Sequence, residues 1–274
     1  MLHRGTLLPW RRAGDEVILS FFSKAVQFYL CRYMNDKPTL FTSLSPALLH
    51  LLNLQDAVVV IIDVFRATST IATALYNGAA RVIPVAAVEE CKRLGSEIPN
   101  AITAGEREGK VIEGLQYGNS PAEYPREFIE GKTLVLTTTN GTKLLHMAFA
   151  KGCDEVITGS FTNLSAVCEY LIKQNKNVVL GCSGWKDMFN LEDTLFAGAV
   201  IGRIKDHFTI HDDASLMAEE IYKLHENNLF DFIQHTTHWH RLAVYGLQKD
   251  LHYCISIDVA NVLPIYKNDE LVIG

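Results

Sequence analysis

The chain lacks three features: a long uninterrupted apolar run, an excess of basic residues and any close pair of cysteines. Its formal charge is -6 over 274 residues, whereas a nucleic-acid-binding surface is basic and clustered. We therefore expect no nucleic-acid partner, and local positive groups must attract any anionic ligand, because the overall field repels it. The six cysteines are scattered, which is typical of the reduced thiols of a cytoplasmic protein.

Several familiar catalytic motifs are also missing. The sequence contains no Gly-x-x-x-x-Gly-Lys-Ser/Thr loop, no Gly-x-Ser-x-Gly turn and no dinucleotide-binding fingerprint. These absences disfavour nucleotide kinases, α/β-hydrolases and Rossmann dehydrogenases. The chain also has no internal repeat and no low-complexity tract, so an ordinary globular fold is expected.

The first 33 residues are the least regular part of the sequence. Arginines precede an apolar stretch at residues 17–30, which superficially resembles a secretory signal. Acidic residues stand before that stretch, charged and polar residues interrupt it, and no small-residue cleavage site follows. It is also too broken to span a bilayer, so we expect no membrane partner. We interpret residues 1–33 as a start-site extension or a poorly ordered tail, with an appended amphipathic helix as the alternative.

From residue 34 onward, short apolar segments alternate with helical patterns. The predicted strands are residues 39–42, 57–63, 81–85, 101–104, 133–138, 155–158 and 177–182. The predicted helices are residues 46–53, 70–77, 88–96, 121–129, 141–150, 163–174 and 191–207. This alternation predicts an α/β fold, a three-layer α/β/α domain over residues 34–274 with a largely parallel or mixed sheet. After about residue 212 the pattern becomes helical and polar, and a smaller C-terminal α+β subdomain is an option.

The most informative segment follows the predicted strand at residues 57–63. That strand is short, apolar and rich in Val and Ile, which is typical of a strand buried on both faces. Asp63 ends it, Arg66 follows, and a helical pattern begins within a run of hydroxyl side chains, Thr68, Ser69 and Thr70. Ligands of open α/β sheets bind outside the carboxyl ends of the strands, where helix N-termini offer N–H groups to anions. We predict that Asp63 is a catalytic residue and metal ligand, that Arg66 clamps an anion, and that the hydroxyl groups bind its oxygens.

A second hydroxyl cluster follows the predicted strand at residues 133–138. It comprises Thr137, Thr138, Thr139, Asn140 and Gly141. Thr is common in strands and Asn-Gly marks a turn, so a plain strand–turn–helix junction explains the same residues. The cluster also repeats the arrangement after Asp63, and we predict that it binds the same substrate anion. This prediction requires Asp63 and the threonines to share one pocket.

The segment at residues 105–121 is long, rich in Gly and not periodic, which indicates a functional loop. Glu106 is a candidate general base and metal ligand, and Arg107 is a candidate second anion clamp. A solvated charged turn is the alternative for this pair. Farther along, Asn119 and Ser120 precede a proline in a turn and helix-start signal that offers N–H groups, and we predict that they bind substrate.

Two further groups have an ordinary explanation beside a chemical one. Glu192 and Asp193 occupy the first turn of a predicted helix, where carboxylates complement the helix dipole, and Asp193 is also a candidate metal ligand. His235, His238 and His240 suggest a zinc site. They lack a nearby Cys partner, however, and we interpret them as a surface histidine cluster.

Five of these elements together resemble the 2-phosphosulfolactate phosphatase family, and the resemblance runs from about residue 34 to the end of the chain. They are Val-Ile-Ile-Asp-Val-Phe-Arg-Ala-Thr-Ser-Thr ending at Thr70, Gly-Glu-Arg-Glu-Gly at 105–109, Gly-Asn-Ser-Pro at 118–121, Thr-Thr-Thr-Asn-Gly-Thr at 137–142 and Leu-Glu-Asp at 191–193. One such element is weak, but five in the same order are specific. The chain departs from the family pattern at Phe65, where Leu is usual, and in its N-terminal extension. Neither departure removes a charged or hydroxyl group from the predicted site.

The resemblance implies Mg²⁺-dependent hydrolysis of (2R)-2-phospho-3-sulfolactate to (2R)-3-sulfolactate and phosphate, a step of coenzyme M synthesis in methanogens. Mg²⁺ with Arg66 and Arg107 would supply the positive partners that such a small phosphorylated anion needs when it leaves water. The residues leave open whether Asp63 attacks phosphorus or a water molecule does so. The alternatives are a phosphatase for another small phosphorylated carboxylic acid and a non-catalytic anion-binding protein. Acid–base candidates beside the hydroxyl clusters favour an enzyme, and a homo-oligomer is compatible with the sequence.

Overall fold

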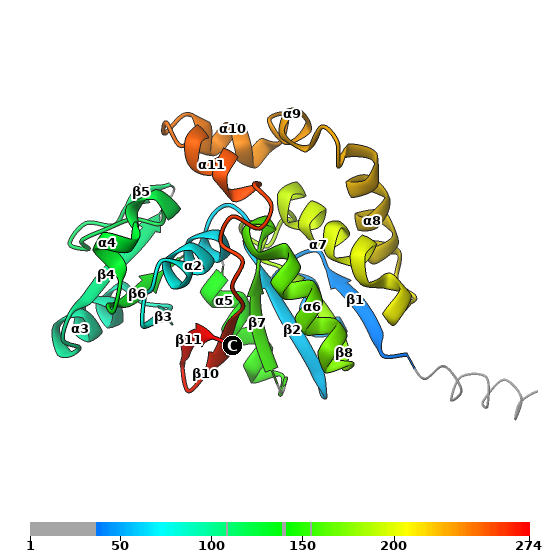
Figure 1. Ribbon diagram of the computed structural model, residues 1–274, viewed down its shortest axis with the longest axis horizontal. Coiled ribbons are helices and arrows are strands. Elements are labelled where there is room, and N and C mark those ends of the chain that lie inside the picture. The colour runs from blue at the N-terminus through cyan, green and yellow to red at the C-terminus, as the bar shows by residue number, and fades with distance from the viewer. Residues whose placement is uncertain (1–36, 108, 139–140, 154) are drawn as a thin grey trace, which may run out of the picture. The chain divides into compact units, whose positions relative to one another are not determined.

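The structure is a computed structural model that describes residues 37–107, 109–138, 141–153 and 155–274 (Figure 1). Its described strands are β1 (Thr39–Ser43), β2 (Ala57–Ile62), β3 (Arg81–Val85), β4 (Ala101–Arg107), β5 (Lys110–Val111), β6 (Thr133–Thr137), β7 (Glu155–Gly159), β8 (Asn177–Cys182), β9 (Thr209–Ile210), β10 (Pro264–Lys267) and β11 (Glu270–Ile273). They form one sheet in the order β5-β4-β6-β3-β11-β10-β7-β2-β8-β1-β9. Each of the predicted strands is present, which confirms that part of the sequence-based prediction.

The helices lie between these strands. They are α2 (Ala67–Tyr76), α3 (Val88–Glu97), α4 (Arg126–Ile129), α5 (Gly141–Ala150), α6 (Leu164–Gln174), α7 (Leu191–Ile204), α8 (Asp213–His225), α9 (Leu229–Ile233), α10 (Thr237–Ala243) and α11 (Gln248–Cys254). Short 3₁₀ helices add η1 (Pro46–Leu51), η2 (Pro121–Glu123), η3 (Phe161–Asn163) and η4 (Lys205–His207). The helix predicted over residues 121–129 is divided into η2 and α4, because Pro125 lacks the N–H that a continuous helix would use there.

The sheet is mixed, and a C-terminal hairpin joins two parallel groups of strands. Strands β4, β6 and β3 pair parallel with one another, and so do β7, β2, β8, β1 and β9. The hairpin β10–β11 pairs antiparallel with β7 on one side and with β3 on the other. Its turn holds Asn268 and Asp269 at positive φ, the conformation that a two-residue hairpin turn requires. This hairpin was not predicted from the sequence, although an Asn-Asp pair between apolar residues is a hairpin signal.

Strand β2 lies between β7 and β8 in the larger parallel group and is buried on both faces. Val58, Val60 and Ile62 pack into the cluster that contains α6 and α7. Val59 and Ile61 point the other way and pack against α5 and η1. Full burial of a Val or Ile side chain contributes about 1.5–3 kcal/mol, so the two-sided packing fixes β2 firmly in register.

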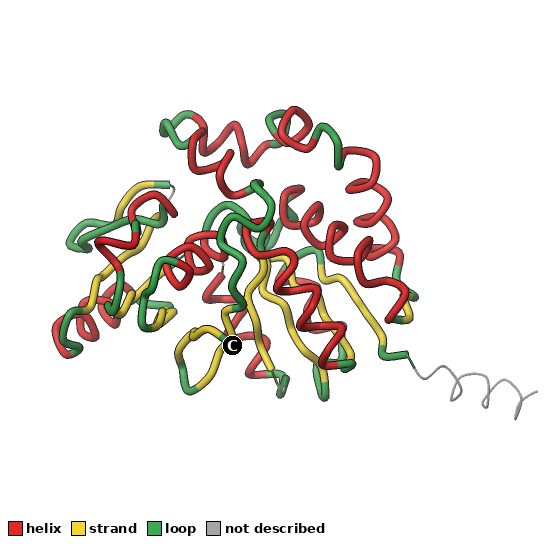
Figure 2. Tube along the Cα trace, viewed as in Figure 1, coloured by secondary structure: helices red, strands yellow, loops and turns green. Residues whose placement is uncertain are grey.

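The smaller parallel group is also covered on both faces. Helices α2 and α4 pack on one face of β3, β4 and β6, and Cys91 of α3 packs on the other with Val85 and Val135. Figure 2 shows helices on both sides of the strands. The α/β class and the mixed sheet of the prediction are therefore confirmed.

The remaining predictions of organisation concern the loop at 105–121 and the two ends of the chain. The first residues of the predicted loop belong to a strand, because β4 continues to Arg107 and pairs antiparallel with β5. Residues 38–274 form one compact unit that includes α8–α11, and residues 1–33 lie outside the described part. Among the described helices, none has the length and apolar character needed to cross a membrane.

Candidate active site

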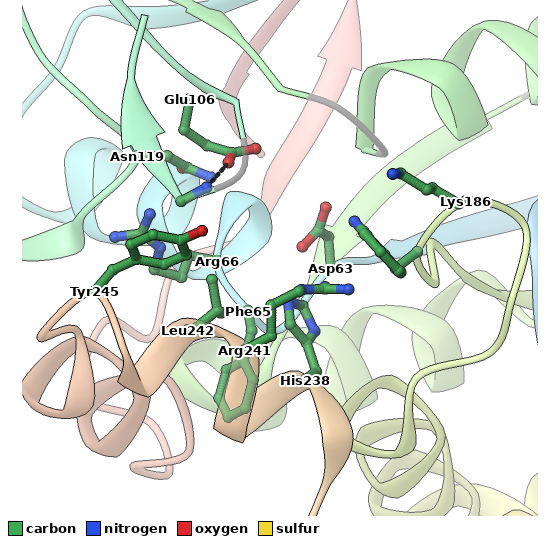
Figure 3. Close-up of a pocket in the computed structure, with 12 residues that line it drawn as sticks. Asp63, Phe65, Arg66, Glu106, Asn119, Lys186, His238, Arg241, Leu242 and Tyr245 are labelled. Atoms are coloured by element: carbon green, nitrogen blue, oxygen red, sulfur yellow. Dashed lines mark hydrogen bonds between the residues drawn. The ribbon is translucent and has the colours of Figure 1, made fainter.

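A pocket of about 250 Å³ opens at the carboxyl ends of β2, β4 and β8, beside α10 (Figure 3). Its lining residues are Asp63, Phe65, Arg66, Glu106, Gly109, Asn119, Trp185, Lys186, His238, Arg241, Leu242 and Tyr245. Four predicted site residues therefore come together from distant parts of the sequence: Asp63, Arg66, Glu106 and Asn119. The volume and the charged lining suit a small polar ligand.

Asp63 is the residue immediately after β2, and the hydroxyl groups of α2 hold its backbone. Thr68 Oγ1 donates to the Asp63 carbonyl at 2.9 Å and accepts from the Asp63 N–H at 3.2 Å. Ser69 donates to the Val64 carbonyl at 2.9 Å, and Thr70 donates to the Asn119 carbonyl at 3.0 Å. The three hydroxyl groups predicted to bind substrate oxygens are thus buried and hydrogen-bonded to main-chain carbonyls. They stabilise the backbone segments that carry the pocket residues.

Burial raises the pKa of the Asp63 carboxyl group from 3.8 to about 6. The positive charge of His238 and the Ala67 N–H act in the opposite direction, whereas the negative charges of Glu106 and Glu192 raise the pKa further. A carboxyl group tuned toward neutral pH in a pocket is a candidate for chemistry, because it exchanges a proton or accepts a cation at little cost.

Arg66 enters the pocket already paired with a carboxylate. Its Nη1 donates to Asp250 at 2.7 Å, and the other Asp250 oxygen accepts from Ser120 Oγ at 2.8 Å. This contact orients the guanidinium group and leaves its remaining N–H groups for a ligand. Ser120 therefore positions Arg66 through Asp250. The buried Asn119 lines the pocket directly, and the Asn119 Oδ1 has no hydrogen-bond partner among the described residues.

Glu106 and Arg107 are neighbours in β4 with different surroundings. Glu106 lines the pocket, and its Oε2 accepts from the Gly109 N–H at 2.9 Å. Arg107 donates to the carbonyl of Glu106 at 2.8 Å and to Thr137 Oγ1 at 3.4 Å, and it does not line this pocket. The structure thus places Arg107 between the ends of β4 and β6.

The two threonines of the second hydroxyl cluster that the structure describes, Thr137 and Thr138, do not line this pocket. Thr137 is buried at the end of β6, where it donates to the Ala86 carbonyl at 3.4 Å. Thr138 lines a separate small apolar cavity together with Thr68. Thr139 and Asn140 lie outside the described residues, and Gly141 begins α5. Within the described chain, Asp63 therefore shares its pocket with Glu106 and Asn119 rather than with Thr137 or Thr138.

Asp193 ties two loops of the site together. Its Oδ1 accepts from the Val64 N–H at 2.9 Å, and its Oδ2 accepts from the Gly184 N–H at 3.1 Å. The loop after β2 and the loop after β8 are thus held by a single carboxylate. Burial raises the pKa of Asp193 well above its usual value, and the charge of Glu192 adds to this effect.

His238 corrects the interpretation of the histidine cluster as a surface feature. His235 and His240 are exposed, but His238 is buried and lines the pocket. Its Nδ1 contacts the fully buried Glu192, and it lies 3.0 Å from Asn190 Nδ2. His238 precedes the apolar Trp239, and it lies four residues before the apolar Leu242, on the same helical face. This pattern could have distinguished His238 from the exposed His235 and His240.

The charged groups of the pocket fit a hard cation such as Mg²⁺. Asp63 and Glu106 line the same space, and the charge of Glu106 is one cause of the raised Asp63 pKa, so a cation there would relieve their repulsion. Mg²⁺ commonly uses one or two carboxylates and completes its shell with water and substrate phosphate. Both oxygens of Asp193, in contrast, accept main-chain hydrogen bonds. Among the described residues, no group of three or more His, Cys, Asp or Glu side chains is arranged to hold a metal by itself.

The fold and the pocket together define a three-layer α/β protein with a pocket of charged side chains at the strand ends. A family model of 2-phosphosulpholactate phosphatase matches residues 43–269. Curated relatives include a "probable 2-phosphosulfolactate phosphatase" of Thermotoga petrophila, 42% identical over 214 residues, which cover 78% of this chain and 91% of the relative. A protein with the same description from Caldanaerobacter subterraneus subsp. tengcongensis is 41% identical over 219 residues, which cover 79% of this chain and 90% of the relative. The chain belongs to the 2-phosphosulfolactate phosphatase family, whose name describes hydrolysis of a phosphate monoester.

Proposed function

We propose that this protein is a Mg²⁺-dependent phosphatase that converts (2R)-2-phospho-3-sulfolactate to (2R)-3-sulfolactate and phosphate. Family membership supports the reaction class. One structural observation supports its assignment to a site: Asp63 and Arg66, from the loop after β2, line one small pocket together with Glu106 of β4. Phosphoryl transfer depends mainly on positioning and charge stabilisation, and this combination of groups can supply both.

Arg66 would bind the phosphate group. Its contact with Asp250 fixes the guanidinium plane, so its remaining N–H groups would meet phosphate oxygens without a large loss of side-chain entropy. Asn119 also lines the pocket, and its Nδ2 would donate a hydrogen bond to a phosphate oxygen of the bound ester.

Asp63 and Glu106 would hold the Mg²⁺ ion. The ion would neutralise phosphate charge and stabilise the charge that develops on the transferred group. Glu106 is oriented for this by the Gly109 N–H, and Asp63 by the hydroxyl-bonded turn that begins α2. Asp193 would act by positioning, because it holds the loop after Asp63 against the loop after β8.

Asp63 would be the central reactive group, either as a nucleophile toward phosphorus or as the group that activates a water molecule. His238 would donate a proton to the departing alkoxide. Glu192 holds its Nδ1, and Nε2 makes no hydrogen bond to a described residue. A carboxylate that fixes one imidazole nitrogen leaves the other available for proton transfer, as in other acid–base sites.

A phosphate-release assay tests the proposal. The purified protein is incubated with phosphosulfolactate in the presence of Mg²⁺, and again after the metal is removed with a chelator. We expect turnover with Mg²⁺, at least a hundredfold loss on chelation and recovery when Mg²⁺ is returned. A panel with 2-phospholactate and glycerol 2-phosphate separates this substrate from other small phosphate esters. Metal-independent release, or faster turnover of another ester, would contradict the proposal.

The cellular setting is part of the same proposal. We place the enzyme in the cytoplasm and in coenzyme M synthesis, the pathway that the family resemblance implies. All five described cysteines are free thiols, as is usual in a reducing compartment. Deletion of the gene in a host that makes coenzyme M should cause phosphosulfolactate to accumulate, and re-expression should reverse this.

A further inference from the structure

Two cationic side chains in the pocket belong to none of the groups discussed so far. Lys186 follows β8, and Arg241 is on α10. Both lie against the indole ring of Trp185: the Lys186 Nζ is 4.5 Å from the ring centroid and the Arg241 Cζ is 3.7 Å from it. All three residues line the pocket that contains Asp63.

The Trp185 side of this cluster is held by a tight turn. The N–H of Trp185 donates to the Met188 carbonyl at 2.8 Å, and the N–H of Met188 donates back at 3.0 Å. Lys186 and Asp187, the two central residues, both have positive φ, as in a hairpin turn of the type I′ class. The two hydrogen bonds between Trp185 and Met188 thus close the turn and keep Lys186 next to the Trp185 ring.

The Arg241 side is held by α10. The helix begins at Thr236, whose Oγ1 accepts from the Trp239 N–H at 3.2 Å. His238, Arg241 and Leu242 are three and four residues apart, so one face of α10 presents all of them to the pocket. Helix α10 thereby holds the Arg241 guanidinium group against the Trp185 ring, on one side of the pocket.

These two cations differ from Arg66 in charge balance. Arg66 forms a salt bridge with Asp250, whereas neither Lys186 nor Arg241 forms a salt bridge with any described residue. Two like charges on one ring repel each other. Burial lowers the pKa of Arg241, while the negative charges of Glu192, Glu106 and Asp63 act in the opposite direction. An anion beside Trp185 would relieve both costs.

We propose that Lys186 and Arg241, presented by Trp185, form a second anion subsite that binds the non-phosphate oxyanion of the substrate, a sulfonate or a carboxylate. This inference rests on the proposed function and specifies its selectivity. The substrate class is a small phosphate monoester with a second strong anion within a few bonds of the ester oxygen. Asp193 sets the distance between the two subsites, because it binds the N–H groups of Val64 and Gly184.

Substrate selectivity tests the subsite. Arg241→Met and Lys186→Met keep much of the side-chain length and remove the charge. We compare kcat/KM for phosphosulfolactate, for 2-phospholactate, which has only the carboxylate, and for glycerol 2-phosphate, which has neither anion. The loss on phosphosulfolactate should exceed the loss on glycerol 2-phosphate by roughly 10- to 100-fold, the effect of one charge-assisted hydrogen bond. Lys223→Met removes one positive charge from exposed α8 and controls for net charge.

The two-anion comparison also identifies which group the subsite takes. A loss on 2-phospholactate as large as that on phosphosulfolactate assigns the subsite to the carboxylate, and a much smaller loss assigns it to the sulfonate. Equal losses on all three esters would overturn the inference, because the cations would then act on the phosphate.

Binding separates this inference from the proposed function. Isothermal titration calorimetry with 3-sulfolactate should give a Kd at least tenfold weaker for Arg241→Met than for the wild type or Lys223→Met. Unchanged binding in Arg241→Met, or no binding by the wild-type protein, would overturn the subsite even if hydrolysis occurs. Selective binding without turnover of phosphosulfolactate would overturn the proposed function and leave the subsite supported.

Discussion

The first turn of α7 buries Glu192 and Asp193 beside the pocket, whereas the middle of the same helix packs Gly198 against Ala218 of α8. Both regions are excluded from water. At the pocket, burial acts on carboxyl groups and raises the pKa of Asp63 and Asp193. At the α7–α8 contact, burial acts on small apolar surfaces that fit without a gap.

The difference separates function at the pocket from stability at the contact between α7 and α8. Buried carboxyl groups oppose folding, because a charge that leaves water costs free energy unless it is paired. The close contact at Gly198 favours folding and performs no chemistry. A substitution in the first region should therefore reduce activity more than stability, and a substitution in the second should do the reverse.

The largest expected effect is on turnover in Asp63→Asn. The amide keeps the shape of the side chain but can neither bind a cation by charge nor act as a nucleophile or base. We expect kcat to fall by at least about a thousandfold, near 4 kcal/mol of transition-state stabilisation, with an unchanged circular dichroism spectrum. Near-normal turnover in this variant would remove Asp63 from the centre of the mechanism. Rapid-quench trapping of a phosphoenzyme in the wild type would identify Asp63 as the nucleophile.

The next effect is on stability at the α7–α8 contact. A Cβ atom at Gly198 would lie 1.9 Å from the Ala218 carbonyl oxygen, so Gly198→Ala must push the helices apart. We expect a loss of about 3 kcal/mol in the free energy of unfolding by urea. Gly202→Ala in the same helix is the matched control, because nothing lies within 4 Å of its Cβ position. That control should gain up to about 1 kcal/mol through helix propensity, and similar losses in both variants would contradict the packing argument.

A smaller effect on activity is expected at the Arg66–Asp250 pair. Arg66→Lys keeps the charge but replaces a planar fork by a single ammonium group, which cannot contact both Asp250 and a phosphate in the same way. We expect kcat/KM to fall by roughly 30-fold, about 2 kcal/mol, with most of the loss in KM. Lys249→Arg, at an exposed neighbour of Asp250, is the control and should retain wild-type kinetics. Full activity in Arg66→Lys would show that the fork is unnecessary.

The smallest effect concerns stability as a function of pH in metal-free buffer. The folded protein raises the Asp63 pKa from 3.8 to about 6, so it retains the proton more strongly than the unfolded chain between these values. Stability contributed by this group is therefore lost as pH rises through that window. Asp63→Asn removes the penalty and should be more stable than the wild type by on the order of 1 kcal/mol at pH 7.5, with a smaller difference at pH 4.5. A difference that is constant across this range would contradict the assignment.

Particular residues show how far the sequence predicts the site. Asp63, Arg66 and Glu106 were identified because each ends or follows a predicted strand, and strand ends are adjacent in a parallel sheet. Asn119 was identified from a turn and helix-start signal. Thr68, Ser69 and Thr70 were identified by the same reasoning, but their hydroxyl groups bond to main-chain carbonyls. Sequence gives the position of a hydroxyl group along the chain, and its rotamer and nearest acceptor depend on packing.

Other residues were inaccessible to that reasoning. His238 and Arg241 belong to a short helix more than fifty residues after β8, and no local pattern indicates which strand end that helix approaches. Lys186 follows Trp185 in the sequence, but only the fold brings Arg241 to the same ring. The hairpin β10–β11 has a local turn signal, but its place in the sheet was inaccessible, because its pairing with β7 and β3 joins segments far apart in the chain.

The sequence by itself determined the alternation of strands and helices, the burial of β2 on both faces and the carboxylate at its end, because hydrophobic period and turn chemistry are local properties. Only the tertiary structure decided that Glu192 meets His238, that Arg66 meets Asp250 and that one carboxylate at residue 193 joins two loops. Those contacts depend on the crossing of elements distant in sequence, and the geometry of such crossings is set by the packing of the whole core.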